Sequence, residues 1–111
     1  MQQQIDALIE TIKADYSEWM LRSVTNMKVT TDMIERFNNS VDYTVGKKYI
    51  KVLNGNGSVW GFVVNTDTDA KFRKGDILKA AGWNAPARNA ARGNIVDGGY
   101  CVNWTGPLYL K

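Results

Sequence analysis

The sequence predicts an α+β fold in which two N-terminal α-helices decorate a small antiparallel β-barrel or curled sheet. Two observations carry this prediction. Apolar residues recur at helical spacing over residues 3–41, and from residue 49 onward short apolar runs alternate with turns rich in asparagine, aspartate and glycine. A chain of 111 residues buries one core, so we expect a single domain at 1–111, helical over 1–44 and β-rich over 45–111.

The first helix is predicted over residues 3 to about 24. Its apolar residues repeat every three or four positions and therefore share one face of a helix. They are Ile5, Leu8, Ile9, Ile12, Tyr16, Trp19 and Met20. This stripe is long for a core of this size, so we expect part of it to bury against a second copy, in a homodimer or higher homo-oligomer.

The second helix is predicted to begin at Thr30 or Thr31, because a threonine side chain can cap the free backbone N–H groups at a helix start. Four apolar residues then share a face, namely Met33, Ile34, Phe37 and Val41. The stretch "FNNSVDYTVG" ends the helical pattern.

A β-hairpin is predicted from "KYIKVL", "NGNG" and "SVWGFVV", because asparagine and glycine accept the positive φ of tight turns. Strand alternation puts Trp60 and Phe62 on one face, with Tyr49 beside them. Rings in a small sheet usually belong to the core, but beside arginine they also suit nucleobase stacking. Both interpretations stay open.

The rest of the β-rich part predicts turns and short strands, about five strands in all. "NTDTDAKFRKGD" is turn-rich, and "DILKAA" reads as a short strand. A closing hairpin is predicted from "NIV", "DGG" and "YCVNWTGPLYL". Its alternation places three side chains on one side, those of Tyr100, Val102 and Trp104.

The segment "GWNAPARNAARGN" predicts a short helix that Pro86 opens and Gly93 ends. Arg88 and Arg92 then lie one turn apart on one face. Their planar guanidinium groups suit a diphosphate, and the segment itself contains no acid that would neutralise them. The alternative is that both arginines only make a surface helix soluble.

Composition argues against catalysis. The chain has no histidine, which is the commonest general base and metal ligand, and its single cysteine is Cys101. Four acids stand beside glycine, threonine and lysine, where turn residues usually stand, namely Asp67, Asp69, Asp76 and Asp97. We therefore expect that the protein is not an enzyme and that it holds neither a metal ion nor a cofactor.

Charge and targeting signals point to the cytoplasm and to an anionic partner. The net charge of +3 favours anions without demanding nucleic acid. The N-terminus "MQQQIDALIETIK" has no apolar run beside a basic flank, so it is not a secretory signal. A lone cysteine agrees with a reducing compartment, and nothing resembles a membrane span.

The stretches "SVWGFVV" and "FRKGDILKAAGWNAPARNAARGNI" resemble a family of small phage proteins, the first described type of Thoeris anti-defence protein. The resemblance covers residues 45 to 96 well, the helices by type only, and the C-terminal strand hardly at all. It implies a helix-decorated barrel that dimerises through its helices. It also implies a sponge that sequesters, without cutting, the cyclic ADP-ribose isomers made by bacterial Thoeris TIR enzymes. Some members also bind cyclic oligonucleotides at separate sites.

The resemblance also implies a set of ligand-binding residues. Arg88 and Arg92 match the paired arginines of the family's alanine-rich segment. Trp19 matches its helix tryptophan, and either Phe62 or Trp60 matches its central aromatic residue. The set is Trp19, Arg22, Phe62, Asn65, Asn84, Arg88 and Arg92. In this hypothesis the arginines neutralise a pyrophosphate, the rings sandwich adenine, and the amides fix ribose hydroxyls. Apart from the resemblance, Asn84 and Asn94 flank the arginine segment with amides able to read a base or ribose.

Two other functions compete with a nucleotide sponge. A small barrel that binds single-stranded nucleic acid would use the same rings and basic residues along an extended backbone. Its affinity would fall steeply with salt, because several phosphates release counterions. A structural phage module without a ligand is the third alternative.

Overall fold

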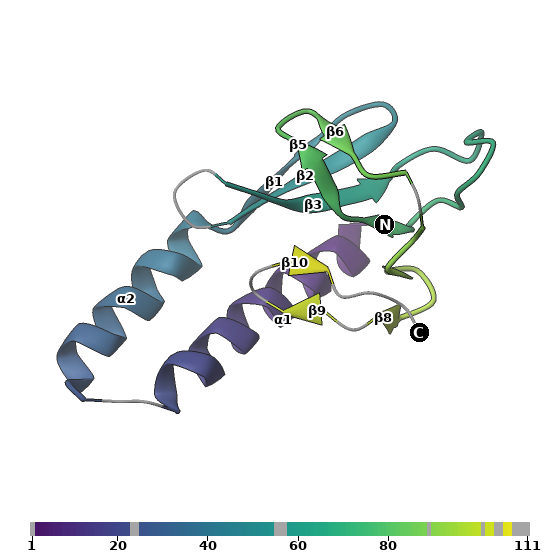
Figure 1. The fold of residues 1–111 in the computed structure, drawn as a ribbon. Coiled ribbons are helices and arrows are strands. Elements are labelled where there is room, and N and C mark those ends of the chain that lie inside the picture. The colour runs from purple at the N-terminus through teal and green to yellow at the C-terminus, as the bar shows by residue number, and fades with distance from the viewer. Residues whose placement is uncertain are drawn as a thin grey trace.

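The computed structural model describes residues 2–22, 25–54, 58–88, 90–100, 102–103 and 106–107. It confirms the α+β class, with two helices followed by antiparallel strands (Figure 1). The elements are α1 (Gln2–Leu21), α2 (Met27–Ser40), β1 (Asp42–Val45), β2 (Tyr49–Asn54), β3 (Ser58–Val64), β4 (Ile77–Leu78), β5 (Ala80–Gly82), β6 (Ala85–Pro86), β7 (Gly93–Asn94), β8 (Gly99–Tyr100), β9 (Val102–Asn103) and β10 (Gly106–Pro107).

The strands form one main sheet, in the order β1-β2-β3-β4, and three two-stranded ribbons. In the part of the chain that the structure describes, the main sheet is open, so the barrel alternative does not hold. The described strands number ten where about five were expected. Most of the additional strands are only two residues long, and β1 begins before the expected start of the β-rich part.

Helix α1 confirms the first predicted helix. The buried residues of its apolar stripe are Ile5, Leu8, Ile9, Ile12 and Tyr16. These side chains all belong to the main core, and Tyr16 also packs against α2.

Helix α2 begins earlier than predicted. Its cap is Asn26, whose side-chain oxygen accepts a hydrogen bond from the backbone N–H of Val29 at 3.2 Å. The predicted caps Thr30 and Thr31 lie inside the helix, and Thr30 is buried there. The prediction was wrong because an asparagine already satisfies the N-terminal donors one turn earlier.

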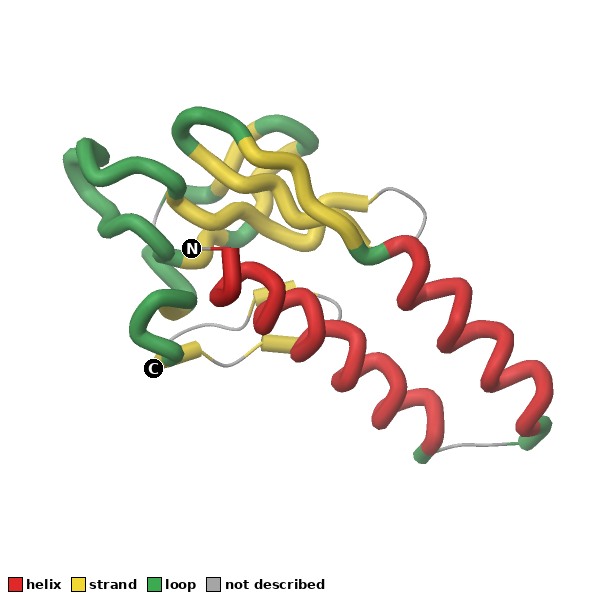
Figure 2. The backbone as a smooth tube through the Cα atoms, turned by 180° about the vertical axis from the view of Figure 1, so that it is seen from behind, coloured by secondary structure: helices red, strands yellow, loops and turns green. Residues whose placement is uncertain are grey.

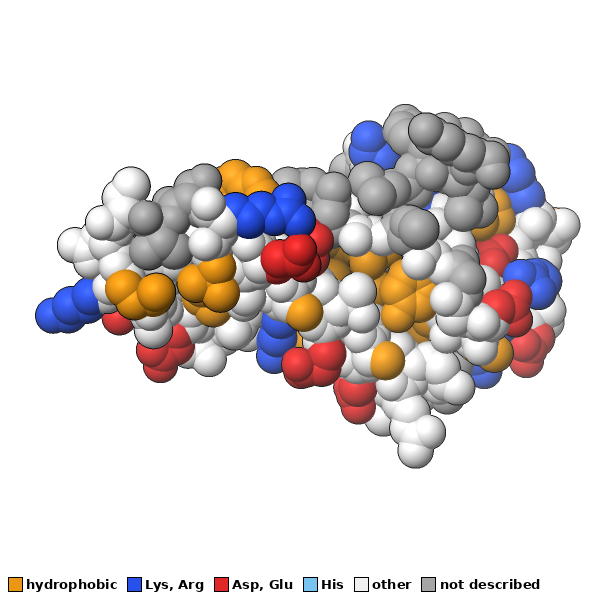
Figure 3. Space-filling view, turned by 90° about the horizontal axis from the view of Figure 1, so that it is seen from below, with side chains coloured by type: hydrophobic (Ala, Val, Ile, Leu, Met, Phe, Trp, Pro, Cys, Tyr) orange, Lys and Arg blue, Asp and Glu red, His pale blue; other side chains and the backbone are white. Residues whose placement is uncertain are grey.

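The two helices form a hairpin that projects from the sheet. The distal end joins α1 to α2, as the front and back views show (Figures 1 and 2). Tyr16 and Phe37 stack at 3.9 Å between ring centroids, where the two helices pack on each other. Beyond this stack, exposed apolar side chains collect on the last turn of α1 and on α2, and some are visible from below (Figure 3). They are Trp19, Leu21, Met27, Val29 and Met33.

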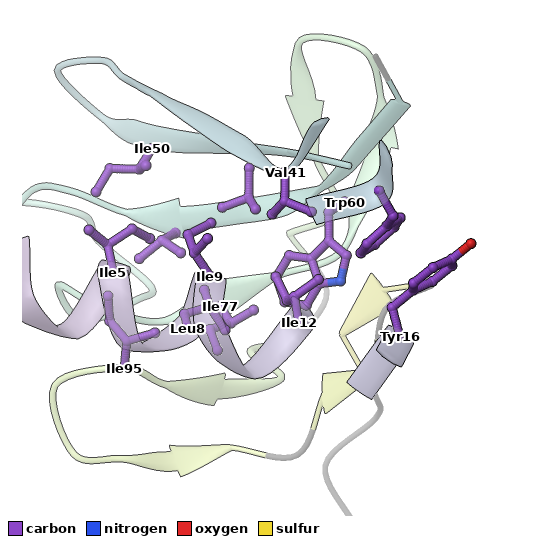
Figure 4. Close-up of a cluster of buried hydrophobic side chains, with 13 residues drawn as sticks. Ile5, Leu8, Ile9, Ile12, Tyr16, Val41, Ile50, Trp60, Ile77 and Ile95 are labelled. Atoms are coloured by element: carbon purple, nitrogen blue, oxygen red, sulfur yellow. The ribbon is translucent and has the colours of Figure 1, made fainter. Parts of the chain in front are cut away.

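The main core lies between α1 and the main sheet (Figure 4). From the sheet it receives Ile50, Val52, Trp60, Val63 and Ile77. Strands β1, β2 and β3 pair antiparallel, and β3 pairs β4 through Phe62 opposite Leu78 and Val63 opposite Ile77. Strand β3 is therefore central, and residues 60–64 are all buried.

A β-bulge separates the two rings that the sequence placed on one face. Val52 pairs with Gly61 but the next residue, Leu53, pairs with Val59, so Trp60 is the extra residue on β3. Its ring points from the sheet toward α1 (Figure 4), whereas Phe62 packs on the opposite face. The prediction of a shared face was wrong because the bulge breaks the two-residue alternation.

A second, smaller core covers the sheet face that points away from the helices. It consists of Phe62, Val64, Phe72 and Leu78, with Tyr49, Val59, Ala80 and Ala91 packed around it. The β5–β6 ribbon lies over this face (Figure 1). This core has polar residues at its rim, and the candidate site is built there.

The predicted helix from Pro86 to Gly93 does not form. Pro86 pairs with Ala80 in the β5–β6 ribbon, residues 87–88 and 90–92 have no regular structure, and Gly93 belongs to β7. Backbone N–H groups at both ends of the segment are used elsewhere. Ala87 donates to the Lys79 carbonyl and Arg92 donates to the Ile77 carbonyl, each at 2.7 Å. These tertiary hydrogen bonds override the helical propensity of the alanines.

The C-terminal part confirms a closing hairpin and adds a second one. Strands β7 and β8 pair, and β9 pairs with β10. Tyr100 and Val102 both pack against the main core, as their predicted common side requires. Trp104 lies outside the described residues.

Asn94 is a structural residue rather than an amide available to a ligand. It is 4% exposed. Its Nδ2 donates to Asp76 Oδ1 at 2.8 Å and to the Lys74 carbonyl at 3.1 Å. Its Oδ1 accepts from the backbone N–H groups of Val96 and Asp97. Both ends of the amide are therefore engaged in joining two turns.

Gly75 stands beside Asn94 and should tolerate no side chain. Its φ is +93°, and a Cβ there would lie 2.8 Å from Val96 Cγ2. We expect Gly75→Ala to lower the free energy of unfolding by about 1–3 kcal/mol through backbone strain, before any steric cost. Urea unfolding measures this change.

Gly82→Ala is the matched control, because a Cβ at Gly82 meets nothing within 4 Å. Equal stability of the two variants would contradict the strained turn at Gly75.

Candidate anion-binding site

Two neighbouring pockets lie at the rim of the second core, where β2 begins. The first, the Arg88 pocket, has a volume of about 340 Å³ and is lined by Lys48, Tyr49, Thr66, Thr68, Asp69, Ala70 and Arg88. The second, the lysine pocket, has a volume of about 320 Å³ and is lined by Thr44, Val45, Gly46, Lys47, Lys48, Tyr49, Lys51, Phe62 and Asn84. The two pockets share Lys48 and Tyr49, so they form one continuous surface.

The lysine pocket carries a concentrated positive charge. Lys47, Lys48 and Lys51 line it, and none of the described residues that line it is acidic. Lys51 Nζ donates to Asn84 Oδ1 at 2.6 Å and lies 4.6 Å from the centroid of the Trp83 ring. The tip of the β5–β6 ribbon is thereby held against β2, and the Trp83 side chain remains 56% exposed.

The turn between β1 and β2 forms the other wall of the lysine pocket. Gly46 donates its backbone N–H to the Tyr49 carbonyl at 2.9 Å. The Gly46 carbonyl accepts from Asn65 Nδ2 at 2.8 Å, and the Asn65 backbone N–H donates to the Lys48 carbonyl at 2.7 Å. Asn65 therefore fixes the turn that presents Lys47 and Lys48.

The Arg88 pocket contains a bidentate ion pair. Arg88 Nη1 and Nη2 each donate to one carboxylate oxygen of Asp69, both at 2.8 Å. Arg88 Nη1 also donates to Tyr49 Oη, and the guanidinium lies 4.9 Å from the centroid of the Phe72 ring. Lys71 Nζ donates to the Arg88 carbonyl at 2.6 Å.

Asp69 is held in place by its own loop as well as by Arg88. Its Oδ1 accepts from the backbone N–H groups of Lys71 and Phe72, at 2.9 and 3.0 Å. The hydrogen bonds from Arg88 and then from these two amides hold the pKa of Asp69 well below its usual range. The same pairing raises the pKa of Arg88 above its ordinary value.

The structure brings four of the predicted ligand-binding residues to this rim. Phe62 and Asn84 line the lysine pocket, Arg88 lines its neighbour, and Asn65 supports the turn between β1 and β2. Phe62 is 2% exposed, and the Tyr49 ring packs against it in a T-shaped arrangement with 6.0 Å between ring centroids. Most of the Phe62 ring therefore serves the second core.

The other three predicted residues lie elsewhere. Arg92 is 1% exposed, so it is a core residue, and without the predicted helix it does not share a face with Arg88. Trp19 and Arg22 lie at the distal end of α1, away from the sheet (Figure 1). Arg22 pairs there with Glu18 at 2.8 Å. The predicted arginine clamp on one helix face is therefore wrong.

Sequence reasoning missed the residues that give this rim its charge. Lys47, Lys48 and Lys51 stand at the start of a predicted strand, where their density was a usable signal. Trp83 was read only as part of the segment before Pro86. The Asp69–Arg88 pair had no signal in the sequence, because its members are 19 positions apart and join through a loop without regular structure.

Three of the four acids that the sequence placed in turns, Asp69, Asp76 and Asp97, make turn or ion-pair contacts. Asp76 Oδ2 accepts from the Arg73 backbone N–H at 2.9 Å, as a turn residue does, and Asp97 pairs with the Arg73 side chain at 2.8 Å. Across the described residues, histidine, cysteine and acidic side chains form no group of three suited to a metal ion. The described helices include none that is long and apolar enough to cross a membrane.

Comparison with known families places the chain in one of them. Residues 1–110 match the model of DUF7717, which is described as a family of unknown function, and the chain belongs to that family. No curated protein and no solved structure matches the chain.

The Asp69–Arg88 pair should make stability depend on pH in the acid range. The folded-state pKa of Asp69 lies below its ordinary value of 3.8, so the contribution of the pair is present above that pH and is lost as the pH falls below it. Asp69→Asn should therefore be less stable than the parent at pH 7, and the difference should narrow as the solution is acidified. Urea unfolding of both proteins between pH 7 and about pH 2 measures this. A difference that stays constant over the range would contradict the assignment.

Proposed function

We propose that this member of the DUF7717 family binds and sequesters an anionic nucleotide-type signal of the cyclic ADP-ribose class. In this proposal it is a phage anti-defence protein that inhibits Thoeris immunity by holding the signal without cleaving it. The observation that carries the proposal is the lysine pocket, with three lysines and no acid among its described lining residues. The resemblance of residues 45 to 96 to Thoeris anti-defence proteins selects the ligand class.

Phosphate binding is the role proposed for the lysines. Each ammonium is a compact charge with three donors, and Lys48 faces both pockets. A diphosphate is long enough to touch more than one such group. The two pockets have volumes of about 340 and 320 Å³, and each volume is in the size range of small-ligand sites.

Base and ribose recognition are the roles proposed for the tip of the β5–β6 ribbon. The Trp83 ring is exposed and backed by Lys51, so one face can stack on a purine. Asn84 presents an amide beside it, whose Oδ1 already accepts from Lys51. These two residues take the place of the Phe62 ring, most of which is buried.

Homo-oligomerisation is part of the proposal, because an open pocket gains affinity when a second chain encloses its ligand. The exposed apolar end of the helical hairpin supports it. Trp19 is 53% exposed there, and Met27 is 58% exposed. Side chains of this kind on one projecting element suit burial against a second copy. Trp19 and Arg22 would then reach a ligand only across that interface.

The proposed mode of action is binding without turnover, in the cytoplasm of the infected bacterium. The sequence contains no histidine, and Asp69 and Asp76 are occupied by turn and ion-pair contacts. Tight binding without cleavage would then be enough to lower the concentration of free signal. Cyclic oligonucleotides are a second ligand class that the resemblance suggests, and the lysine pocket is compatible with their phosphates.

Binding of single-stranded nucleic acid is the second candidate function. Lys47, Lys48 and Lys51 near an exposed Trp83 ring are also the components of a stacking platform on a basic surface. The salt dependence of affinity separates the candidates. A strand that contacts several phosphates loses affinity steeply with salt, whereas one diphosphate gives a shallower slope.

Lys48→Ala and Lys51→Ala should each weaken binding of a cyclic ADP-ribose isomer. A hydrogen bond between charged partners contributes about 1.5–3 kcal/mol, so each loss should be roughly tenfold to a hundredfold. Titration calorimetry at fixed salt measures this, with the melting temperature as the folding control. Lys28→Ala makes the same charge change on the exposed surface of α2. Equal losses in all three variants would contradict a specific site and indicate only a general charge effect.

The protein should be at least a dimer at tens of micromolar concentration, roughly the range in which weak but specific homodimers assemble. Light scattering measures its mass. Met27→Asp places a charge on the exposed apolar end and should shift the protein toward monomer. A parent protein that is monomeric in this range would contradict the shared interface and leave Trp19 without a role in ligand binding.

A further inference from the structure

We propose that the Arg88 pocket is a second anion subsite, one that the protein's own Asp69 carboxylate occupies until a diphosphate-bearing ligand displaces it from Arg88. The inference rests on the proposed function, because the displacing ligand is the one bound by the lysine pocket. It adds a built-in competitor that decides which anions the site accepts.

The contacts of Arg88 are those of an anion receptor with its anion in place. Two parallel N–H donors grip two oxygens of Asp69 at 2.8 Å each, which is the geometry in which arginine holds a carboxylate or a phosphate. Tyr49 lies on the same guanidinium edge, and Phe72 supports its face. The Arg88 side chain is still 39% exposed and lines the pocket. A phosphate arriving in the pocket therefore meets the guanidinium that Asp69 holds.

Asp69 is the more buried partner of the pair, with a side chain 9% exposed against 39% for Arg88. Two backbone amides of its own loop hold Asp69, and the buried Phe72 anchors that loop. Arg88 lies in a segment without regular structure, and Lys71 Nζ holds its backbone carbonyl while the guanidinium stays partly open to the pocket. An arginine side chain has many rotamers, so it can turn from Asp69 toward an incoming phosphate without refolding of the loop.

Asp69 would select among anions by making them compete. An anion with one charge and one contact has no advantage over a carboxylate already fixed in bidentate geometry. A diphosphate can place one phosphate among Lys47, Lys48 and Lys51 and bring the other to Arg88, because Lys48 lines both pockets. Specificity for a diphosphate then arises in two ways. The Asp69 carboxylate repels other anions and competes with them for Arg88, while the cationic side chains attract the diphosphate.

The test compares Asp69→Asn with Asp67→Asn, using inorganic pyrophosphate and orthophosphate as probes. Asparagine keeps the oxygen that accepts from Lys71 and Phe72 but loses the charge that holds Arg88. Asp67 is an exposed acid two residues away, so its replacement controls for net charge. Asp69→Asn should bind pyrophosphate about tenfold more tightly than the parent, Asp67→Asn should change little, and discrimination against orthophosphate should fall.

Arg88 must be the source of that gain. In the double variant Asp69→Asn/Arg88→Ala the improvement should disappear, which isolates the coupling between the two positions. Asp69→Ser, whose hydroxyl can also accept from the loop amides, is measured in parallel in case the asparagine variant fails to fold. Unchanged or weaker pyrophosphate binding in folded Asp69 variants, or a gain that persists without Arg88, would overturn the inference.

The outcome is distinguishable from failure of the proposed function. That proposal fails if the parent protein does not bind cyclic ADP-ribose isomers. The subsite proposal is judged on pyrophosphate and on the Asp69 variants alone. If the parent binds the nucleotide but Asp69→Asn shows no gain in pyrophosphate binding, the proposed sequestering function stands and the proposal of a competing Asp69 carboxylate is rejected.

Discussion

The burial of both faces of β3 is the constraint on which the rest of the structure depends. Residues 60–64 are all buried, so two layers must cover this strand. The bulge at Trp60 turns this ring toward the main core that the sheet shares with α1, whereas Phe62 and Val64 pack on the opposite face. A small chain has few residues for a second layer, and it uses a short ribbon and irregular segments. The rim of that layer is polar, and both pockets lie there.

The second core explains why the basic residues converge. Tyr49 packs against Phe62 and brings the start of β2 to the rim, with Lys48 and Lys51 on either side. Phe72 anchors the loop that carries Asp69, and the ring also lies under the Arg88 guanidinium. Packing thus fixes one carboxylate and positions several cations around it. The apolar residues of this layer are buried in the second core, so the side chains that stay exposed around it are polar or charged.

The sequence predicted the parts of the fold that follow from local periodicity. The α1 stripe and the hairpin formed by β2 and β3 are confirmed, because their patterns coincide with long-range packing. The helix from Pro86 to Gly93 was wrong, because its backbone donors bond to carbonyls of β4 and the residue after it, which no local pattern records. The bulge at Trp60 likewise changes the alternation through pairing with a different strand.

The candidate site was partly predictable for the same reason. Of the residues predicted to bind a ligand, Asn84, Asn65 and Arg88 lie around the two pockets, whereas Arg92 is buried. Asp69 was predicted only as a turn residue. Asp69 does form a turn, yet its second role depends on a contact across 19 positions. Local sequence indicates a residue's backbone role, whereas a charge pair is decided by where the fold brings distant loops together.

The central proposal is that these pockets bind an intact nucleotide-type anion. Mass spectrometry of small molecules released by heat tests it most directly, on protein purified from bacteria in which a Thoeris system is active. We expect an uncleaved cyclic ADP-ribose isomer in an amount comparable to that of the protein chain. Release of no nucleotide, or of linear ADP-ribose alone, would contradict the account.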